Sequence, residues 1–389
     1  MSETGRYIKV VADRDIPFLK GALEEVADVV YLPGKDIDSS ILKDADALIT
    51  RTRTKCNSTL LEGSSVKFIA TASIGYDHID TEYCESNGIK WTNAPGCNSS
   101  SVEQYILSVL LSVAGRHRMS LNEITIGIIG VGYVGSKIER ICKAMGMKVL
   151  LNDPPRAKDE GGDEFVSLNK IQEEANFITF HVPLYRSGEY KTLHLADERF
   201  FDGLSRMPIL INSSRGEVVD GNALKKSLAT GKVKAAVLDV WEEEPALDNE
   251  LMSLVDLATP HIAGYSVDGK SNATGMSVRA LSRFFGLGLD DWEPVDLPSP
   301  RIDNLIIDGS RFDLQELLVV LARRAYDVLR DDDVLRKNPE NFEQLRAAYP
   351  VRREPAAIRV NIINDYIAAG PVLRQLGYHA RTDYFNTVT

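Results

Sequence analysis

The stretch TIGIIGVGYVG, residues 125–135, decides the fold of this chain, because it combines an apolar strand, a glycine turn and the start of a helix. Gly130 suits the tight turn, Gly132 lets the backbone approach a pyrophosphate, and Gly135 lets the helix pack against the strand. The free N–H groups and the dipole at the helix N-terminus favour an anion. Asp153 ends the next apolar run, where an acid accepts ribose hydroxyls. Together these features predict an NAD site.

Composition sets broader limits that agree with this prediction. A chain of 389 residues with 44% hydrophobic and 26% charged residues is expected to form about two or three globular domains. The net charge of −11, without any Lys/Arg-rich run, argues against a nucleic-acid partner. Residues 1–13 lack a signal-peptide pattern, and no apolar stretch is long enough to span a membrane. We therefore expect a cytoplasmic protein without a membrane partner.

The four cysteines, Cys56, Cys84, Cys97 and Cys142, are scattered and form no CxxC pair. Isolated thiols in a chain of this size are typical of reduced core cysteines in the cytoplasm rather than of a disulfide or zinc framework.

Strands and helices are expected to alternate along most of the chain. Residues 6–90 show several short apolar runs with a helical stretch at 19–26, which predicts a small parallel sheet. A long apolar helix is expected at 102–118, and the alternation then continues to about residue 264. The proline-rich segment 292–300 indicates a boundary before a separate C-terminal module.

Three polar side chains follow predicted strands and are candidates for catalysis. Arg215 comes directly after a buried strand, where its planar guanidinium can bind a carboxylate through two hydrogen bonds, although a solvated loop arginine would look the same. Glu244 belongs to an acidic run, and His261 is one of six histidines, so neither is decisive alone. Together they form an acid–base pair, because a carboxylate orients an imidazole and stabilises its charged form.

In this order, GxGxxG, Asp153, Ser-Arg-Gly at 214–216, Asp-Val-x-x-x-Glu-Pro at 239–245 and Pro-His-Ile-Ala-Gly at 260–264 resemble the D-isomer-specific 2-hydroxyacid dehydrogenases. The resemblance covers roughly residues 7–290 and is specific. Further segments resemble one branch of that family, which acts on a phosphorylated four-carbon acid; they lie at 94–98, 152–156, 190–197, 261–265, 325–332 and 345–354.

The resemblance implies an α/β fold with two Rossmann-like doubly wound domains, one for the substrate and one for NAD, and a C-terminal α+β dimerisation domain. The implied boundaries are 1–100 for the substrate domain, completed by about 265–290, then 101–264 for the NAD domain and 291–389 for the dimerisation domain. A homodimer is therefore expected.

The implied reaction is oxidation of a small phosphorylated 2-hydroxy acid, 4-phospho-D-erythronate, by NAD to the 2-oxo acid, a step toward pyridoxal 5′-phosphate. In this reaction His261 takes the hydroxyl proton, Glu244 stabilises the resulting imidazolium and Arg215 holds the carboxylate. The reaction needs no metal.

The resemblance also assigns binding residues. Val182 stands where a polar residue is frequent, so any contact from it must come from its backbone or from packing. Substrate contacts are expected from Thr52, Ser73 and Tyr265, and cofactor contacts from Gly130, Gly132, Tyr133, Val134, Gly135, Asp153, Val182, Ser213, Ser214, Asp239 and Gly264.

Other conspicuous residues have simpler interpretations. His78 is expected to be structural, and the acids at 331–333 to form a solvated turn rather than a metal site. Arg352 and Arg353 are either surface charges or contacts to the substrate phosphate at a dimer interface.

Two alternative functions remain open from the sequence. The first is a sibling reductase for 3-phosphoglycerate or for glyoxylate and hydroxypyruvate, and the second is an NAD-sensing co-repressor on the same scaffold. The C-terminal module argues against the first, and the complete set of Arg215, Glu244 and His261 favours catalysis over the second.

Overall fold

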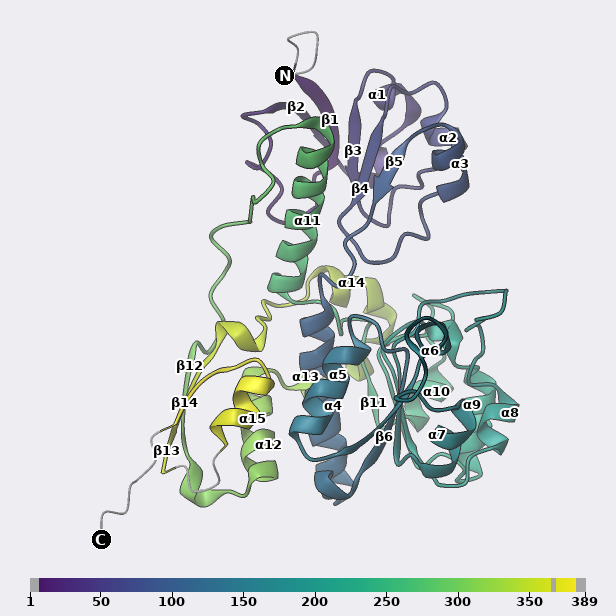
Figure 1. Ribbon diagram of the computed structural model, residues 1–389, viewed down its shortest axis with the longest axis vertical. Helices are drawn as coiled ribbons and strands as arrows, with labels where there is room; N and C mark the ends of the chain where they lie inside the picture. The colour runs from purple at the N-terminus through teal and green to yellow at the C-terminus, as the bar shows by residue number, and fades with distance from the viewer. Residues whose placement is uncertain (1–6, 365–368, 383–389) are drawn as a thin grey trace. The chain divides into compact units, whose positions relative to one another are not determined.

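The computed structural model describes residues 7–364 and 369–382 and divides into two compact units, Met1–Asn98 with Ser266–Pro298 and Ser99–Tyr265 with Ser299–Thr389 (Figure 1). Each unit contains its own parallel sheet, so each is described by itself.

The first unit is built on a five-stranded parallel sheet in the order β2-β1-β3-β4-β5. Strands β3 and β4 are buried along their whole length, as expected for strands that are covered on both faces. The strands are β1 Ile8–Asp13, β2 Ala27–Leu32, β3 Ala47–Thr50, β4 Phe68–Thr71 and β5 Lys90–Thr92. The helices are α1 Ser39–Leu42, α2 Ser58–Leu61, α3 Thr81–Ser86 and the long α11 Val267–Phe285, which packs against β4.

The prediction of a helix at 19–26 is wrong, because this stretch forms a series of turns between β1 and β2. Phe18 and Gly21 have φ values of 62° and 91°, which a right-handed helix cannot contain. The Glu24 carboxylate also accepts hydrogen bonds from the backbone N–H groups of Gly21 and Leu23, so it competes with helical pairing.

The second unit contains a six-stranded parallel sheet in the order β11-β10-β9-β8-β6-β7. The chain leaves β6 toward β7 on one side and returns to β8 on the other, so the strand order reverses between β6 and β8, where doubly wound sheets bind ligands. The strands are β6 Thr125–Ile129, β7 Lys148–Asn152, β8 Phe177–Phe180, β9 Ile209–Asn212, β10 Ala235–Leu238 and β11 Leu257–Ala258. The helices that follow these strands are α5 Gly135–Ala144, α6 Pro154–Glu160, α7 Leu168–Glu174, α8 Glu198–Asp202, α9 Gly221–Ala229 and α10 Asn249–Leu254.

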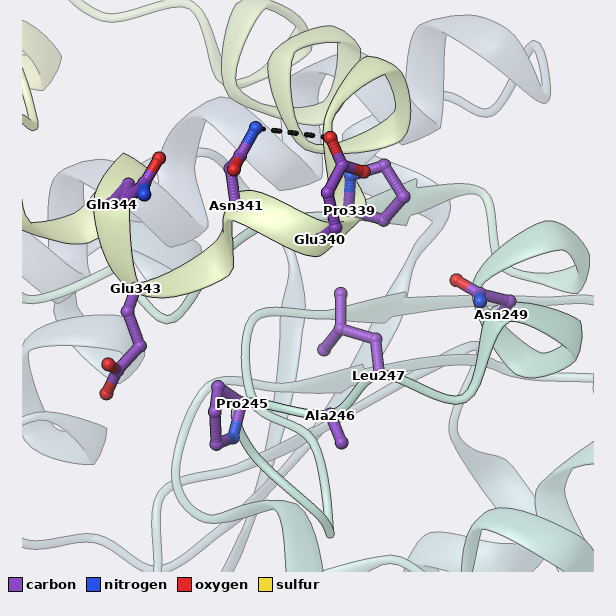
Figure 2. A pocket seen from close by; sticks show the side chains of 9 residues that line it. All are labelled: Pro245, Ala246, Leu247, Asn249, Pro339, Glu340, Asn341, Glu343 and Gln344. Carbon is purple, nitrogen blue, oxygen red and sulfur yellow. Dashed lines mark hydrogen bonds between the residues drawn. The ribbon is translucent and has the colours of Figure 1, made fainter.

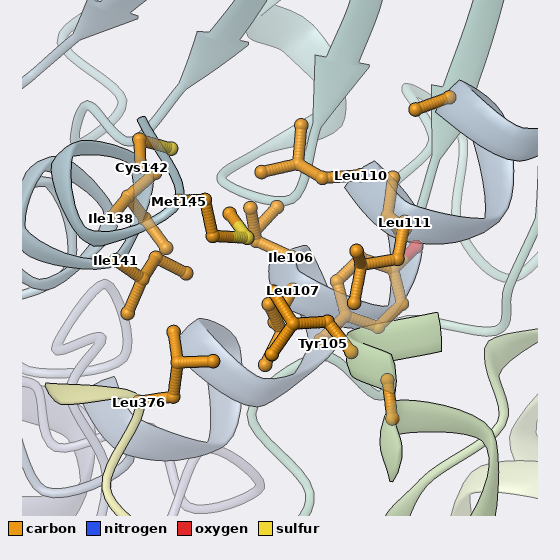
Figure 3. Packing of buried hydrophobic residues seen from close by; sticks show 14 of the residues in the cluster. Tyr105, Ile106, Leu107, Leu110, Leu111, Ile138, Ile141, Cys142, Met145 and Leu376 are labelled. Carbon is orange, nitrogen blue, oxygen red and sulfur yellow. The ribbon is translucent and has the colours of Figure 1, made fainter. Parts of the chain in front are cut away.

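Helix α4, Ser99–Arg116, confirms the predicted long apolar helix and forms the centre of the second unit. Its side chains from Ser101 to Ala114 are buried, because it is covered both by α5 and by the C-terminal helix α12. Figure 3 shows residues 105–111 of α4 packed against side chains of α5 and against Leu376.

The C-terminal module has a separate three-stranded parallel sheet in the order β12-β13-β14. One face of this sheet joins the apolar core around α4, since Leu305, Ile307 and Leu321 belong to the same buried cluster as Ile106. The strands are β12 Asn304–Asp308, β13 Arg359–Ile363 and β14 His379–Thr382, and the helices are α12 Leu314–Ala325, α13 Val328–Lys337, α14 Phe342–Ala347 and α15 Gly370–Gln375.

The structure shows the state of the four cysteines and the character of the helices. All four cysteines are buried and free. Among the residues that the structure describes, no helix is both long and apolar enough to cross a membrane.

Candidate active site

The glycine loop between β6 and α5 is shaped by its backbone. Gly130 has a φ of 89°, and a Cβ atom there would lie 2.7 Å from the His181 carbonyl oxygen. A Cβ atom at Gly135 would lie 2.1 Å from the Gly130 carbonyl oxygen, so the helix can approach the turn only with glycine here. A Cβ atom at Gly132 would meet no heavy atom within 4 Å. The loop is therefore tight at both ends and open in the middle, which fits a bound pyrophosphate.

Asp153 borders this loop at the end of β7. One of its carboxylate oxygens accepts the Val131 N–H at 2.8 Å, and the other caps α6 by accepting the Arg156 N–H at 3.1 Å. Arg156 pairs with Glu160 at 2.7 Å and donates to the Val131 carbonyl oxygen at 2.6 Å. The acid is thus fixed beside the glycine loop, and the nearby arginine is already paired.

The end of β9 presents hydroxyls to the same sheet edge. Ser214 is fixed, because its N–H and its hydroxyl both donate to the Asn212 side-chain oxygen. The Ser213 hydroxyl is buried and has no hydrogen-bond partner among the described residues. Because buried polar groups are normally paired, this hydroxyl fits a site that a cofactor completes.

Three further predicted cofactor residues also lie at this edge. The Tyr133 side chain is 65% exposed in the glycine loop, and Val134 directly precedes α5 as its N-cap. Val182 is half-buried just after β8, and its Cγ1 atom would lie 2.8 Å from a Cβ atom at Gly130, so it contributes packing rather than a polar contact.

His261 and Glu244, which the sequence predicts to act as an acid–base pair, lie within hydrogen-bond distance of each other. His261 Nδ1 lies 2.7 Å from Glu244 Oε2, while Glu244 Oε1 accepts the Trp241 N–H at 3.0 Å. Both side chains are partly exposed, at 30% and 21%. With Nδ1 bonded to the carboxylate, Nε2 remains to accept or return a proton.

The loop that carries His261, residues 259–265, follows β11 and is held by a buried carboxylate. Asp239 accepts hydrogen bonds from the Thr259 hydroxyl at 2.6 Å and from the N–H groups of Ile262 and Ala263 at 2.8 Å each. His261 itself has a φ of 55°, a conformation that needs such support in a residue other than glycine. We refer to residues 259–265 as the histidine loop.

Arg215 lies three residues after the end of β9, at the same edge of the sheet. Its carbonyl accepts a hydrogen bond from the Asn212 side chain at 2.8 Å, and its guanidinium Nη1 donates to the Ser214 carbonyl at 2.8 Å. The side chain is half-buried, so its remaining donors are oriented but not enclosed.

The two substrate residues predicted in the first unit lie after adjacent strands of that unit's sheet. Thr52 is exposed just beyond β3. Ser73 follows β4; its hydroxyl bonds to Thr71 at 2.7 Å and donates to the Gly75 carbonyl at 2.8 Å. His78 Nε2 lies 3.0 Å from the Thr71 hydroxyl, and burial lowers the pKa of His78. His78 therefore belongs to a local hydrogen-bond chain, which agrees with a structural role.

The sequence interpretation of the C-terminal charges needs two corrections. Arg352 is not a surface charge: it is only 5% exposed, and it donates to the Ala263 carbonyl oxygen of the histidine loop at 2.6 Å. The acids at 331–333 do not form a solvated turn but lie within α13, where Asp331 accepts two tyrosine hydroxyls and Asp332 accepts the Ala258 N–H. Apart from Tyr326, five residues before Asp331, these partners are 18 or more residues away in sequence, so local pattern gave little signal. Among the described residues, no group of His, Cys, Asp and Glu has a metal-binding arrangement.

Tyr265, at the end of the histidine loop, also meets the C-terminal module. Its ring packs edge-on against Tyr349 with centroids 6.0 Å apart, and the Arg346 guanidinium lies 5.5 Å from its centroid. The predicted substrate residue is thus fixed by two side chains that the sequence did not single out.

A surface cavity of about 590 Å³ begins just after Glu244 (Figure 2). Its walls come from the segment after the acid–base pair and from the region around α14, and neither His261 nor Arg215 lines it. We assign it no part in the chemistry. The lining residues are Pro245, Ala246, Leu247, Asn249, Pro339, Glu340, Asn341, Glu343 and Gln344.

Comparisons with known proteins match most of the chain. Residues 111–263 match the D-isomer specific 2-hydroxyacid dehydrogenase NAD binding domain, and residues 297–377 match a domain of unknown function, DUF3410. The chain is 50% identical to an erythronate-4-phosphate dehydrogenase of Bacteroides fragilis, over 91% of this chain and 99% of that protein. It is 42% identical to an Escherichia coli protein of the same name, over 96% of this chain and 98% of that protein.

Solved structures show the same fold. A D-lactate dehydrogenase from Aquifex aeolicus, complexed with NAD and lactic acid, is 27% identical and has a TM-score of 0.60 over 75% of this chain and 100% of that chain. A 3-phosphoglycerate dehydrogenase from Entamoeba histolytica with NAD bound is 25% identical and has a TM-score of 0.61 over the same shares. The chain therefore belongs to the D-isomer-specific 2-hydroxyacid dehydrogenases, NAD-dependent oxidoreductases, and within them to the erythronate-4-phosphate dehydrogenase family.

Proposed function

We propose that this chain oxidises 4-phospho-D-erythronate with NAD to (R)-3-hydroxy-2-oxo-4-phosphonooxybutanoate, a step in the biosynthesis of pyridoxal 5′-phosphate. The observation that carries the proposal is the 2.7 Å contact between His261 Nδ1 and Glu244, which leaves Nε2 available at the edge of an NAD-binding sheet. The names of the relatives support this choice of substrate.

The chemistry follows from the positions of the side chains. Glu244 accepts the Nδ1 proton of His261, so in the neutral imidazole Nε2 carries the lone pair and takes the proton of the C2 hydroxyl. Bound NAD supplies the hydride acceptor for the C2 hydrogen. Glu244 then stabilises the imidazolium. The free donors of Arg215 bind the substrate carboxylate, and its charge stabilises the oxygen that becomes a carbonyl.

The other predicted residues have matching roles in the proposal. Thr52, Ser73 and Tyr265 contact the substrate, while the glycine loop, Asp153 and Ser213 bind NAD. Asp239 acts through the histidine loop, since its carboxylate is already bonded there. The buried free cysteines support a reducing, cytoplasmic location.

We also propose that the C-terminal module forms a homodimer through the outer face of its sheet. Ile306 and Ile363 on this face are 61% and 40% exposed, although such residues are normally buried. A two-fold contact would cover both in each copy. Ile306→Asp should yield a monomer by light scattering, while Val295→Asp, a change at a residue that is already 75% exposed and precedes the strands of this sheet, should leave the mass unchanged. A dimer that survives Ile306→Asp would contradict this surface.

The substrate assignment is tested with a panel of acids and an NADH absorbance readout. With NAD, we expect the highest kcat/KM for 4-phospho-D-erythronate and lower values for 3-phospho-D-glycerate and unphosphorylated D-erythronate. A higher kcat/KM for 3-phospho-D-glycerate, or for reduction of hydroxypyruvate, would assign the chain to a sibling activity. NADH binding without turnover of any acid would instead favour the NAD-sensing alternative.

A further inference from the structure

Arg352 is a buried cation that joins the C-terminal module to the histidine loop. It lies in the extended segment between α14 and Pro355, it is 5% exposed, and its Nη2 atom donates to the Ala263 carbonyl oxygen at 2.6 Å. Its Nε and Nη1 atoms are buried and have no hydrogen-bond partner among the described residues. Burying a charge is costly, so a side chain held in this way needs a compensating environment.

Two aromatic rings and one carboxylate provide that environment. The Arg352 guanidinium lies 4.6 Å from the ring centroid of Tyr326 and 5.7 Å from that of Tyr349, distances at which a cation is attracted to an aromatic face. Both tyrosine hydroxyls donate to the same Asp331 oxygen at 2.7 Å. Burial raises the pKa of both tyrosines, so they remain protonated donors.

The N–H and carbonyl groups of Ala263 are therefore bound by side chains from different parts of the chain. Asp239, in the NAD domain, accepts its N–H at 2.8 Å, and Arg352, in the C-terminal module, binds its carbonyl at 2.6 Å. Ala263 lies two residues after His261, whose left-handed backbone fixes the direction of the imidazole, and directly before Gly264, an expected cofactor contact. A shift of the Ala263 carbonyl would therefore move both His261 and Gly264.

We propose that Arg352 is a positioning residue: by holding the Ala263 carbonyl it keeps His261 aligned with Glu244 and with the substrate hydroxyl. The C-terminal module thereby takes part in catalysis without touching the reacting atoms. This inference rests on the proposed function, because it assumes that His261 is the base.

The test uses the full chain with Arg352→Met, which keeps the apolar stem and removes the donors. With 4-phospho-D-erythronate we expect kcat to fall about 10- to 100-fold, because a small displacement of a catalytic group is costly, while KM changes little. Arg352→Lys keeps the charge and one donor, so it should recover part of kcat. The matched control is Arg330→Met on α13, whose side chain is 64% exposed, and it should behave as wild type.

Hydrogen exchange gives a readout that is independent of the substrate. In Arg352→Met the amides of the histidine loop should exchange faster, while those of the glycine loop stay unchanged. Unchanged exchange in the histidine loop would overturn the inference even if no acid were turned over and the proposed function itself had failed. Wild-type kcat in a folded Arg352→Met variant would also overturn it.

A milder variant keeps the inference testable if Arg352→Met does not fold. Tyr349→Phe removes only the hydroxyl that donates to Asp331 and retains the ring beside Arg352. It should lower kcat about 2- to 10-fold, the usual range for one lost hydrogen bond, with a matching rise in exchange of the histidine loop. Wild-type values for both readouts would contradict the role assigned to Arg352.

Discussion

The glycine loop and the histidine loop both follow the carboxyl end of a parallel strand in the same sheet, but they are held by different means. The glycine loop is shaped by close backbone contacts at Gly130 and Gly135 and by Asp153 at the end of the next strand. The histidine loop is held by side chains, from Asp239 on one side and from Arg352, far along the chain, on the other. The shape of the glycine loop, the proposed cofactor site, is thus encoded locally, whereas the position of His261, the proposed base, depends on tertiary packing.

The largest effect should come from His261→Asn, which separates the two functions. Asparagine cannot take a proton at neutral pH, so kcat should fall about 10²- to 10⁴-fold. NADH affinity, measured by fluorescence titration, should stay within about 2-fold of wild type because the glycine loop is untouched. His78→Asn is the matched control and should retain turnover. Near wild-type turnover in His261→Asn would show that the base lies elsewhere, with His78 as the next candidate.

Arg215→Gln tests the strand end between the two loops. Loss of the guanidinium removes the hydrogen bonds to the substrate carboxylate, so KM should rise. It also removes the charge near the developing carbonyl oxygen, so kcat should fall. Together these changes should lower kcat/KM about 100-fold. NADH affinity should not change. If only KM changed in steady-state kinetics, Arg215 would bind the ground state without acting on the transition state.

Two glycine variants test the packing of the glycine loop. Gly135→Ala places a methyl group against the Gly130 carbonyl, so it should lower the free energy of unfolding by about 1–3 kcal/mol and weaken NADH binding. Gly132→Ala has room, so its free energy of unfolding should stay within about 0.5 kcal/mol of wild type while NADH affinity falls. Chemical denaturation and NADH titration check both. Equal stability of the two variants would contradict the packing described here.

The smallest effect is expected for cofactor choice. In the proposed site Asp153 would accept ribose hydroxyls and repel an added phosphate, and Arg156 is already paired with Glu160, so NAD should be preferred over NADP. Asp153→Ala should lower the ratio of kcat/KM with NAD to kcat/KM with NADP about 10-fold, since a charge-assisted contact is lost. Comparable efficiency of the wild-type protein with both cofactors would rule out this account of Asp153.

The sequence predicted those features that depend on residues close together in the chain. It predicted the parallel sheets and the long α4, and it pointed to His261 and Glu244, because motifs at strand ends converge on one edge of a doubly wound sheet. It missed the turns at 14–26, where left-handed residues interrupt an apolar pattern that looks helical.

The support from the C-terminal module could not be predicted in this way. Arg352 and Asp331 look like surface charges because Ala263, which binds Arg352, and Tyr349, which binds Asp331, are brought to them only by tertiary packing. The same holds for Asp332, whose partner is the N–H of Ala258.

The most direct test of the central claim follows the hydrogen that is transferred. The intact protein is incubated with NAD and with 4-phospho-D-erythronate that carries deuterium on C2, and both products are analysed by mass spectrometry. The account predicts deuterated NADH and the 2-oxo acid in equal amounts, because the C2 hydrogen leaves as hydride while His261 takes the hydroxyl proton. NADH without deuterium, or binding of NADH without any 2-oxo acid, would contradict it.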